Sequence, residues 1–557
     1  MEKERVQLVV IGAGSTGAAV AWDAAMRGID TILLERGDLA SGTTGKCHGM
    51  LHSGARYAVK DKEGAVECIE ETKLLHKIAP HVLEKTGGLF VGLKEDAEEY
   101  PGYKEKKLEG CKECGIPAEE ISVREALEIE PNLNPEIVDA IWVPHDGTLH
   151  PIGFVMSLCL SGKKYGADIR PYNEVIDILK EGDTVTGVRV KDHLEENIYE
   201  INSDVVVSAA GPWADPIAEM AGVHVPQVPT PGVMVVVNRR VNNVLINHLR
   251  PTSDGDIIVP HHTTSVIGTT SWPVKDADKV PIPKDHVELM LEEGIRKIPA
   301  IEDARILRAY AACRPTIAPE GAAVTSGREL SRTFEAFDHE ARDGVKGFVT
   351  ITGGKMCTAR GMAEQSIDLV CKKLGIKAEC HTREAKLMGA EEPVDTKKLA
   401  ELFGLPRIYV QRSAQRWGAL IKEIFEPIEK EPFRGSFICT DEFVTRAEIE
   451  YSVKNLWAYF INDIRRRTRT GMGTCQGGTC SYQIAGILAE EFDRQPADVH
   501  SDLMSFLKIR FLGDKTACWG DQFRQWKFHE AAYSCLGNYD KLHKGLPFSM
   551  PIFGEAP

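Results

Sequence analysis

The sequence has no long apolar run. A helix that crosses a membrane needs about 20 consecutive apolar residues, and no stretch of this chain offers them. The first residues, MEKERVQLVVIGAG, lead straight into an apolar segment, without the basic, apolar and small-residue sections of a secretory signal peptide. We therefore expect no transmembrane helix and a cytoplasmic location.

The sequence also lacks an excess of basic residues. It has 67 Lys and Arg against 82 Asp and Glu, a net charge of −15, and a pI near 5.7. Binding to nucleic acid requires a basic surface that neutralises phosphates, so we do not expect nucleic acid as a partner. A small anionic substrate stays possible, because a few local arginines can hold it.

Disulfides, low-complexity tracts and internal repeats are not expected either. Fourteen cysteines in a chain without an export signal suggest reduced thiols or metal ligands. The apolar share of 43% and the charged share of 27% are typical of a globular protein. With 557 residues, the chain can form about three or four domain-sized units.

Residues 6–36 carry the strongest motif. Apolar β-branched runs at 6–11 and 31–34 predict two buried strands, and an alanine-rich helical pattern lies between them. The first strand runs directly into Gly-Ala-Gly-Ser-Thr-Gly, which begins the helix. A GxGxxG turn between a strand and a helix predicts a site for an adenine dinucleotide. The motif alone does not distinguish FAD from NAD.

Each residue of this motif has a physical role. Gly12 allows the tight turn, Gly14 lets a pyrophosphate approach the backbone, and Gly17 permits close packing of helix on strand. Glu35, at the end of the second strand, is placed to accept hydrogen bonds from ribose hydroxyls. The neighbouring residues predicted to bind the cofactor are Ser15, Thr16 and Arg36.

The segment 41–57 is small, polar and rich in glycine, which suits close contact with a cofactor. A flexible surface loop is the alternative interpretation. Four functional side chains favour the first: His48, His52, Arg56 and Tyr57. The residues of this segment predicted to contact the cofactor are Thr43, Thr44, His48 and Gly49.

Two later strands also end in glycine. A buried strand at 205–209 leads to Gly211 and Trp213, and another at 347–352 leads to Gly353, Gly354 and Lys355. These strands are expected to complete the α/β domain begun at residue 6. Alternating apolar residues within 231–310 predict an inserted antiparallel domain, residues 60–129 are read as helices, and helical periodicity dominates from 376 onward.

These motifs, together with Ile267-Gly-Thr-Thr270, resemble FAD-dependent glycerol-3-phosphate dehydrogenases of the D-amino-acid-oxidase-like group. The resemblance covers residues 5–375, and the C-terminal region resembles that of the large catalytic subunit of the anaerobic enzyme. It implies an α/β FAD-binding Rossmann-like fold with an inserted antiparallel α+β substrate domain and a mainly helical C-terminal region. The implied limits are 1–80, 146–230 and 312–375 for FAD binding, 81–145 and 231–311 for substrate, and 376–557 for the helical region.

The resemblance also implies an iron–sulfur module, at about 436–490. The family pattern is C-x-C, a long gap and a second cysteine pair, which together hold a 2Fe–2S cluster. Cys439, Cys475 and Cys480 match it, whereas Asp441 replaces the second cysteine. A carboxylate can bind iron but is a harder ligand than a thiolate. The expected outcomes are therefore a cluster with an aspartate ligand, a labile cluster, or a helical module without iron.

The activity that the resemblance implies is oxidation of sn-glycerol 3-phosphate to dihydroxyacetone phosphate, with hydride transfer to the flavin. Arg314 is then the best candidate to bind the phosphate, and Arg56 and Tyr57 are second choices. Lys355 is expected near the developing alkoxide. The related aerobic enzymes carry a histidine on a strand that corresponds to 232–237, where this chain has none. His52 is slightly favoured as the base over His48 or a lysine.

The resemblance further implies iron–sulfur partner subunits that pass electrons towards quinone, and docking at the inner face of the membrane through them. Three other functions stay open at this point. They are a flavin dehydrogenase of a 2-hydroxy acid or amine, a nicotinamide-dependent dehydrogenase, and a non-enzymatic electron carrier or scaffold. The presence of a single Gly-rich fingerprint and the 41–57 loop favour flavin over nicotinamide.

Overall fold

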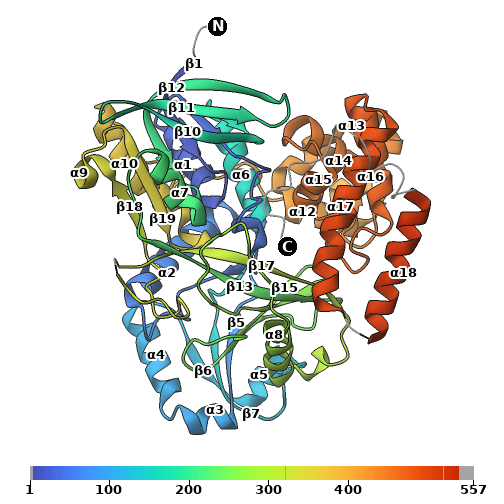
Figure 1. Cartoon of the computed structure of the whole chain (residues 1–557). Coiled ribbons are helices and arrows are strands. Elements are labelled where there is room, and N and C mark those ends of the chain that lie inside the picture. The colour runs from blue at the N-terminus through green and yellow to red at the C-terminus, as the bar shows by residue number, and fades with distance from the viewer. Residues whose placement is uncertain (1–3, 320, 519, 538–557) are drawn as a thin grey trace.

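The computed structural model describes residues 4–319, 321–518 and 520–537. The expected limits at residues 1 and 557 lie outside these ranges. Two large sheets occupy the N-terminal two thirds of the chain, and a helical region follows (Figure 1). Among the described residues, none of the helices combines the length and apolarity needed to cross a bilayer.

The first sheet carries the dinucleotide motif. Its strand order is β10-β11-β12-β1-β2-β9, with β19 beside β12 and β18 beside β19. The pairs β1–β2, β1–β12, β2–β9 and β12–β19 are parallel, as expected for apolar strands buried on both faces. The strands are β1 (Glu4–Ile11), β2 (Thr31–Leu34), β9 (Asp168–Arg170), β10 (Asn173–Glu181), β11 (Thr184–Asp192), β12 (Asn197–Ser208), β18 (Phe334–Asp338) and β19 (Phe348–Gly353).

Three helices pack together beside this sheet: α1 (Ser15–Met26), α6 (Pro151–Lys164) and α10 (Ala359–Leu374). Their small and apolar side chains form one core with β1, β12 and β19. The α/β prediction for the N-terminal part is confirmed, because β19 joins the sheet next to β12. The turns after β1, β12 and β19 therefore meet at one edge, where a ligand binds in such folds.

The second sheet has the order β17-β13-β16-β15-β14-β5-β7-β6 and is antiparallel except for β14 and β5. Helix α8 (Lys284–Lys297) contacts β13 and β16. The strands are β5 (Gly88–Leu93), β6 (Glu119–Ile121), β7 (Ile137–Val143), β13 (Gln227–Val237), β14 (Leu245–His248), β15 (Ile257–His261), β16 (Thr264–Gly268) and β17 (Ile306–Ile317). Small strands β3 (Met50–Leu51), β4 (Leu83–Glu84) and β8 (Gly147–Leu149) form a third sheet.

The interpretation of 60–129 as helices is partly wrong. Helices α2 (Lys62–Ile78), α3 (Lys94–Glu99), α4 (Tyr103–Glu113) and α5 (Val123–Ile129) are present, but β5 and β6 lie among them. Strand β5 is buried along its whole length between β7 and β14. Because β14 is far away in the sequence, local periodicity does not reveal this pairing.

The C-terminal region is mainly helical, as predicted, and α17 lies along β17 of the second sheet (Figure 1). The helices are interrupted at two points that the periodicity from 376 onward does not mark, near Gly418 and between Asn455 and Ile461. The helices are α11 (Thr396–Phe403), α12 (Arg407–Trp417), α13 (Ile421–Lys430), α14 (Arg446–Asn455), α15 (Ile461–Thr468), α16 (Cys480–Phe492), α17 (Pro496–Ala517) and α18 (Gly520–Gly537).

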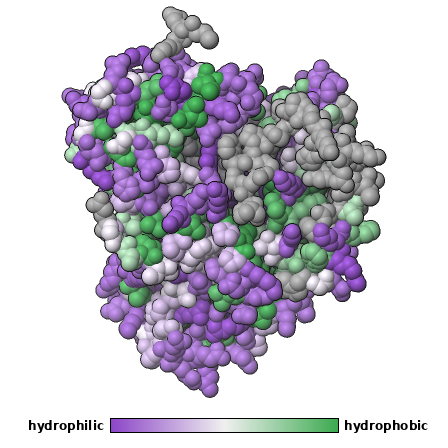
Figure 2. Space-filling view, in the orientation of Figure 1, coloured by the Kyte–Doolittle hydropathy of each residue, from purple (hydrophilic) through white to green (hydrophobic). Residues whose placement is uncertain are grey.

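Ion pairs join this region to the first sheet. Asp38, which follows β2, accepts hydrogen bonds from Arg466 and Arg467 of α15 at 2.7 and 2.6 Å. Burial opposes the charge of Asp38, but the two guanidinium groups hold its pKa below the usual value. On the face seen in Figure 2, the surface of the described residues is mostly hydrophilic, with separate hydrophobic patches. Most large apolar side chains of the described residues are buried.

Candidate active site

The turn after β1 has the geometry that a dinucleotide requires. Gly12 has a φ of +98°, and a Cβ there would lie 2.9 Å from the carbonyl oxygen of Ala209. A Cβ on Gly17 would lie 1.8 Å from the Gly12 carbonyl oxygen, so only glycine permits this approach of helix and turn. The N-terminus of α1 therefore faces the sheet edge, where the helix dipole favours an anion.

Glu35 lies beside this turn. Its carboxylate accepts hydrogen bonds from the backbone N–H groups of Ala13 and Gly37, each at 2.9 Å, and burial raises its pKa. Arg36 lies over the Trp213 ring at 4.4 Å and pairs with Asp278 at 2.6 Å. These contacts place the predicted adenosine-binding residues at one end of a single cavity.

That cavity has a volume of about 1670 Å³ and extends from the dinucleotide turn to the second sheet. Most of the predicted site residues line it. Gly17, Gly49 and Gly354 do not, because they pack against Gly12, His261 and Met362 respectively. The predicted residues that line it are Gly12, Gly14, Ser15, Thr16, Glu35, Arg36, Thr43, Thr44, His48, His52, Arg56, Tyr57, Gly211, Trp213, Arg314, Gly353 and Lys355.

The 41–57 segment lies across the cavity and is not a free surface loop. Thr44 accepts a hydrogen bond from the backbone N–H of Ser15 at 3.1 Å, and Thr43 donates to the Cys313 carbonyl at 2.6 Å. The Nδ1 atom of His48 accepts from the Met50 N–H at 3.1 Å. Burial, then Arg314 and Arg56, lower the pKa of His48 to about 3, so its ring stays neutral.

His52 is a buried, neutral histidine within the site. Its ring lies 5.4 Å from that of Tyr57 and 5.8 Å from that of His48. Burial, together with the neighbouring His48 and Lys355, lowers its pKa well below the usual value. Its Nδ1 atom is buried and has no hydrogen-bond partner among the described residues. A neutral imidazole of this kind can accept a proton at neutral pH.

Lys355 lies next to these rings, at the turn between β19 and α10. Its Nζ atom is 4.7 Å from the Tyr57 ring centroid and donates to the Arg332 carbonyl at 2.8 Å. Although burial opposes the charge, Cys68 and Tyr57 hold the pKa of Lys355 above its usual value. The site therefore keeps a fixed ammonium group beside His52.

Arg314 has no carboxylate partner among the described residues. It donates to the carbonyls of Thr230 and Pro231 at 3.2 Å and of Thr270 at 3.0 Å, which hold the guanidinium across β13 and the turn after β16. Burial, then repulsion from Arg328 and Arg332, lower its pKa. An anion placed among these guanidinium groups would relieve this unfavourable accumulation of charge.

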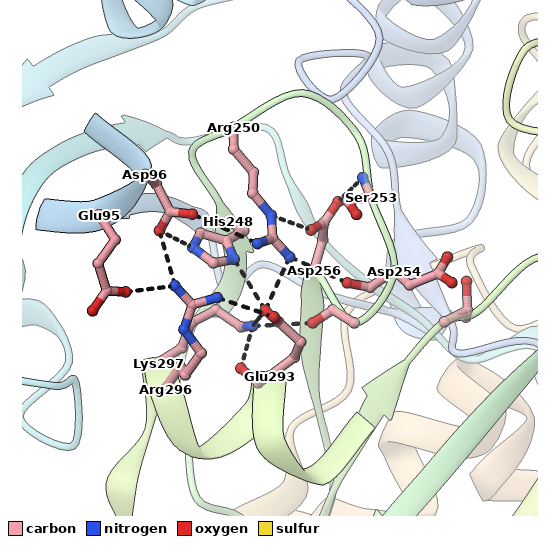
Figure 3. Close-up of polar contacts among 12 residues, drawn as sticks. Glu95, Asp96, His248, Arg250, Ser253, Asp254, Asp256, Glu293, Arg296 and Lys297 are labelled. Atoms are coloured by element: carbon pink, nitrogen blue, oxygen red, sulfur yellow. Dashed lines mark hydrogen bonds and ion pairs between the residues drawn. The ribbon is translucent and has the colours of Figure 1, made fainter. Parts of the chain in front are cut away.

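Arg56, in contrast, is already paired. It donates to Asp256 at 2.7 Å, and both side chains are buried. Asp256 also accepts from Arg250 at 3.3 Å, and Arg250 donates to Glu293 at 2.9 Å. Figure 3 shows the part of this network around Arg250, which reaches from α3 through β14 to α8. Its labelled members are Glu95, Asp96, His248, Arg250, Ser253, Asp254, Asp256, Glu293, Arg296 and Lys297.

The four predicted cluster ligands lie together as two pairs, Cys439 with Cys480 and Asp441 with Cys475. The Cys480 thiol is hydrogen bonded to Cys439 and lowers the pKa of Cys439. The Asp441 carboxylate accepts from the backbone N–H of Cys475 at 2.7 Å and from the Thr474 hydroxyl at 3.0 Å. Within the described ranges, no three His, Cys, Asp or Glu side chains are grouped to hold a metal ion. A 2Fe–2S cluster takes two protein ligands for each iron, so these two pairs are the residues that would hold it.

The sequence reasoning missed three residues of this site. Arg332 and Arg328 lie in the segment between β17 and β18, which has no regular periodicity, and Asp256 precedes β15. A cluster of three arginines within 314–332 was the available signal. Asp256 had no such signal, because its partner Arg56 is 200 residues away in the sequence.

Comparison with known proteins identifies the family. A model described as "FAD dependent oxidoreductase" matches residues 7–360, and one described as "C-terminal domain of alpha-glycerophosphate oxidase" matches residues 380–499. The chain is 41% identical over 548 residues to a subunit of the anaerobic glycerol-3-phosphate dehydrogenase of Haloferax volcanii, covering 97% of this chain and 92% of that protein. It is 40% identical to a subunit of the anaerobic glycerol-3-phosphate dehydrogenase of Escherichia coli K12, covering 98% and 99%. The chain belongs to the family of anaerobic glycerol-3-phosphate dehydrogenase subunits.

A solved structure of the same fold supports the architecture. The FAD complex of glycerol-3-phosphate dehydrogenase from Bacillus halodurans has a TM-score of 0.71 and 22% identity, and covers 92% of this chain and 95% of that one. FAD is the cofactor of this family, and the turn at Gly12 and the long cavity fit it. The predicted fold and the flavin are thereby confirmed.

Proposed function

We propose that this protein oxidises the C2 hydroxyl of sn-glycerol 3-phosphate and forms dihydroxyacetone phosphate. The observation that carries the proposal is the group of cations around Arg314 in the cavity that fits FAD. Arg314 itself has no carboxylate partner in the described chain. The names of the relatives, which are glycerol-3-phosphate dehydrogenases, support the same substrate.

Arg314 and Arg332 would bind the phosphate. A guanidinium group presents paired N–H donors that match the oxygens of a phosphate, and burial strengthens the interaction. Arg314 is fixed by backbone carbonyls, so its orientation is set before the substrate arrives. Arg56 is neutralised by Asp256 and would instead shape the wall of the site.

His52 would take the proton of the C2 hydroxyl. Its neutral ring and its buried, unpartnered Nδ1 atom suit a base. Lys355 would stabilise the negative charge that develops on the C2 oxygen. Bound FAD would supply the hydride acceptor, and the loop at Thr43 and Thr44 would hold it against the second sheet.

We further propose that electrons leave through partner proteins, because the names of the relatives describe them as single subunits of an enzyme. Those partners would carry iron–sulfur centres and would place this chain at the inner face of the membrane. The pairs Cys439–Cys480 and Asp441–Cys475 would hold a 2Fe–2S cluster on this chain, which would supply one-electron chemistry. Chemical analysis of anaerobically isolated protein should find about two iron atoms per chain, and the EPR signal of the reduced protein should be lost in Cys475→Ser. Protein that is loaded with FAD but holds no iron would leave a helical module without a cluster.

The domain limits expected from the sequence are kept as part of the proposal, with FAD binding by the first sheet and substrate contacts from the second. The activity is tested by steady-state turnover with an artificial electron acceptor and identification of the product. Dihydroxyacetone phosphate should form from sn-glycerol 3-phosphate. If lactate or glycine is oxidised instead, the substrate assignment fails. If no candidate substrate is oxidised by FAD-loaded protein, a carrier or scaffold function replaces the enzyme.

A further inference from the structure

A second group of positive charges lies far from Arg314. Arg308, Tyr310 and Arg314 alternate along β17 and therefore point to the same face of the sheet. Arg308 and Arg314 are six residues apart on this strand, a distance of about 20 Å at the usual rise of a β-strand. Both residues line the same cavity, and Arg465 of α15 lines it as well. The cavity thus continues from the proposed substrate site to the boundary between the second sheet and the C-terminal helices.

Arg308 and Arg465 both line the cavity at this boundary and repel each other. Burial, and after it repulsion from Arg308, lower the pKa of Arg465 well below its usual value. Neither guanidinium forms an ion pair with a carboxylate of the described chain. The Nε atom of Arg308 is buried and has no hydrogen-bond partner there.

The neighbouring arginines behave differently. Arg466 pairs with Asp38 at 2.7 Å, and Arg469 pairs with Glu442 at 2.9 Å. Asp514 of α17 is the nearest acid to influence Arg308, but it forms no ion pair with it, and burial raises the pKa of Asp514 to about 6. Arg308 and Arg465 thus differ from Arg466 and Arg469, each of which has a carboxylate partner.

Two guanidinium groups that line one cavity and repel each other would be stabilised by an anion bound between them. Their forked donors suit the paired oxygens of a phosphate. Tyr310 lies beside Arg308, with its ring centroid 5.9 Å from the guanidinium carbon, and lines the same cavity, so its hydroxyl can add a further donor. We propose that Arg308 and Arg465 form a second anion site, which binds a phosphate dianion at the boundary between the second sheet and the C-terminal helices.

Calorimetry on the FAD-loaded full chain tests this proposal. The titrant is inorganic phosphate, and the background is Arg314→Gln, which weakens phosphate binding at the proposed substrate site. This variant should still bind one phosphate per chain. Adding Arg308→Gln should raise the dissociation constant at least tenfold, and Arg465→Gln should do the same from the opposite wall. Arg466→Gln, whose partner is Asp38, is the matched control and should change it less than threefold.

A second titrant, a phosphomonoester such as glycerol 2-phosphate, shows whether the site binds free phosphate or a phosphate ester. Tighter binding than inorganic phosphate indicates a phosphorylated metabolite, and tighter binding of inorganic phosphate indicates the free ion. The site does not exist if Arg314→Gln alone abolishes phosphate binding, or if both added substitutions leave the dissociation constant unchanged. Because the readout is binding, the result is independent of whether sn-glycerol 3-phosphate is the substrate.

Discussion

Replacement of Arg314 by glutamine should remove most of the recognition of the substrate phosphate. The side chain is held by three backbone carbonyls and has no carboxylate partner in the described chain, so its charge is available to a ligand. A hydrogen bond to a charged group contributes about 1.5–3 kcal/mol, so two such bonds would contribute about 3–6 kcal/mol. At about 1.4 kcal/mol for each factor of ten, kcat/KM should fall by about 10² to 10⁴.

The assay is steady-state turnover with an artificial electron acceptor, run with sn-glycerol 3-phosphate and, separately, with glycerol. Glycerol lacks the phosphate, so its low kcat/KM should be nearly the same in the variant and the wild type. Arg314→Lys is the matched control, because it keeps the charge but loses the forked donors. Its kcat/KM for sn-glycerol 3-phosphate should lie between those of the wild type and Arg314→Gln.

An equal loss for both substrates would show that Arg314 supports the fold of β13 and β17 and does not bind phosphate. An unchanged kcat/KM for sn-glycerol 3-phosphate would refute the phosphate-binding role altogether. FAD content, measured by flavin absorbance, should be the same in all three proteins, which separates substrate recognition from cofactor loss.

Three further predictions follow from the same geometry. His52→Gln should lower kcat by about 10² to 10³. In the wild type, the acidic limb of the pH profile of kcat/KM should lie below the ordinary histidine pKa of about 6.5, because burial, His48 and Lys355 keep His52 neutral to lower pH. An acidic limb near 6.5 would exclude His52 as the base. Asp256→Asn leaves the buried Arg56 unpaired and should cost about 3–5 kcal/mol in urea unfolding, with part of the loss restored by adding Arg56→Met; no loss would show that the pair is not needed. Gly12→Ala should lower the FAD-to-protein ratio, because its Cβ would collide with the turn at Ala209; full flavin loading would contradict this.

The dinucleotide site was predictable because its signals are local. The glycines at 12, 14 and 17, the acid at Glu35 and the strands on either side all lie within one short segment. The helical C-terminal region was predictable from its periodicity for the same reason. Only the breaks within two of its helices were not, because they depend on tertiary packing.

The parts that sequence reasoning missed depend on contacts between distant residues. Strand β5 was read as part of a helical region because its partner β14 lies about 150 positions later. The pairing of Arg56 with Asp256 changes a candidate phosphate ligand into a neutralised wall residue. At the expected cluster, Asp441 is engaged by the backbone of Cys475, an interaction that the spacing of the cysteines does not reveal.

Anaerobic titration of the FAD-loaded protein with sn-glycerol 3-phosphate tests the central claim most directly. Flavin absorbance should bleach with about one substrate molecule per flavin, and dihydroxyacetone phosphate should appear in equal amount. Lactate and glycine at the same concentration should leave the absorbance unchanged, and glycerol should bleach the flavin far more slowly. A flavin that stays oxidised with sn-glycerol 3-phosphate, or that bleaches equally well with glycerol, would contradict the proposed function.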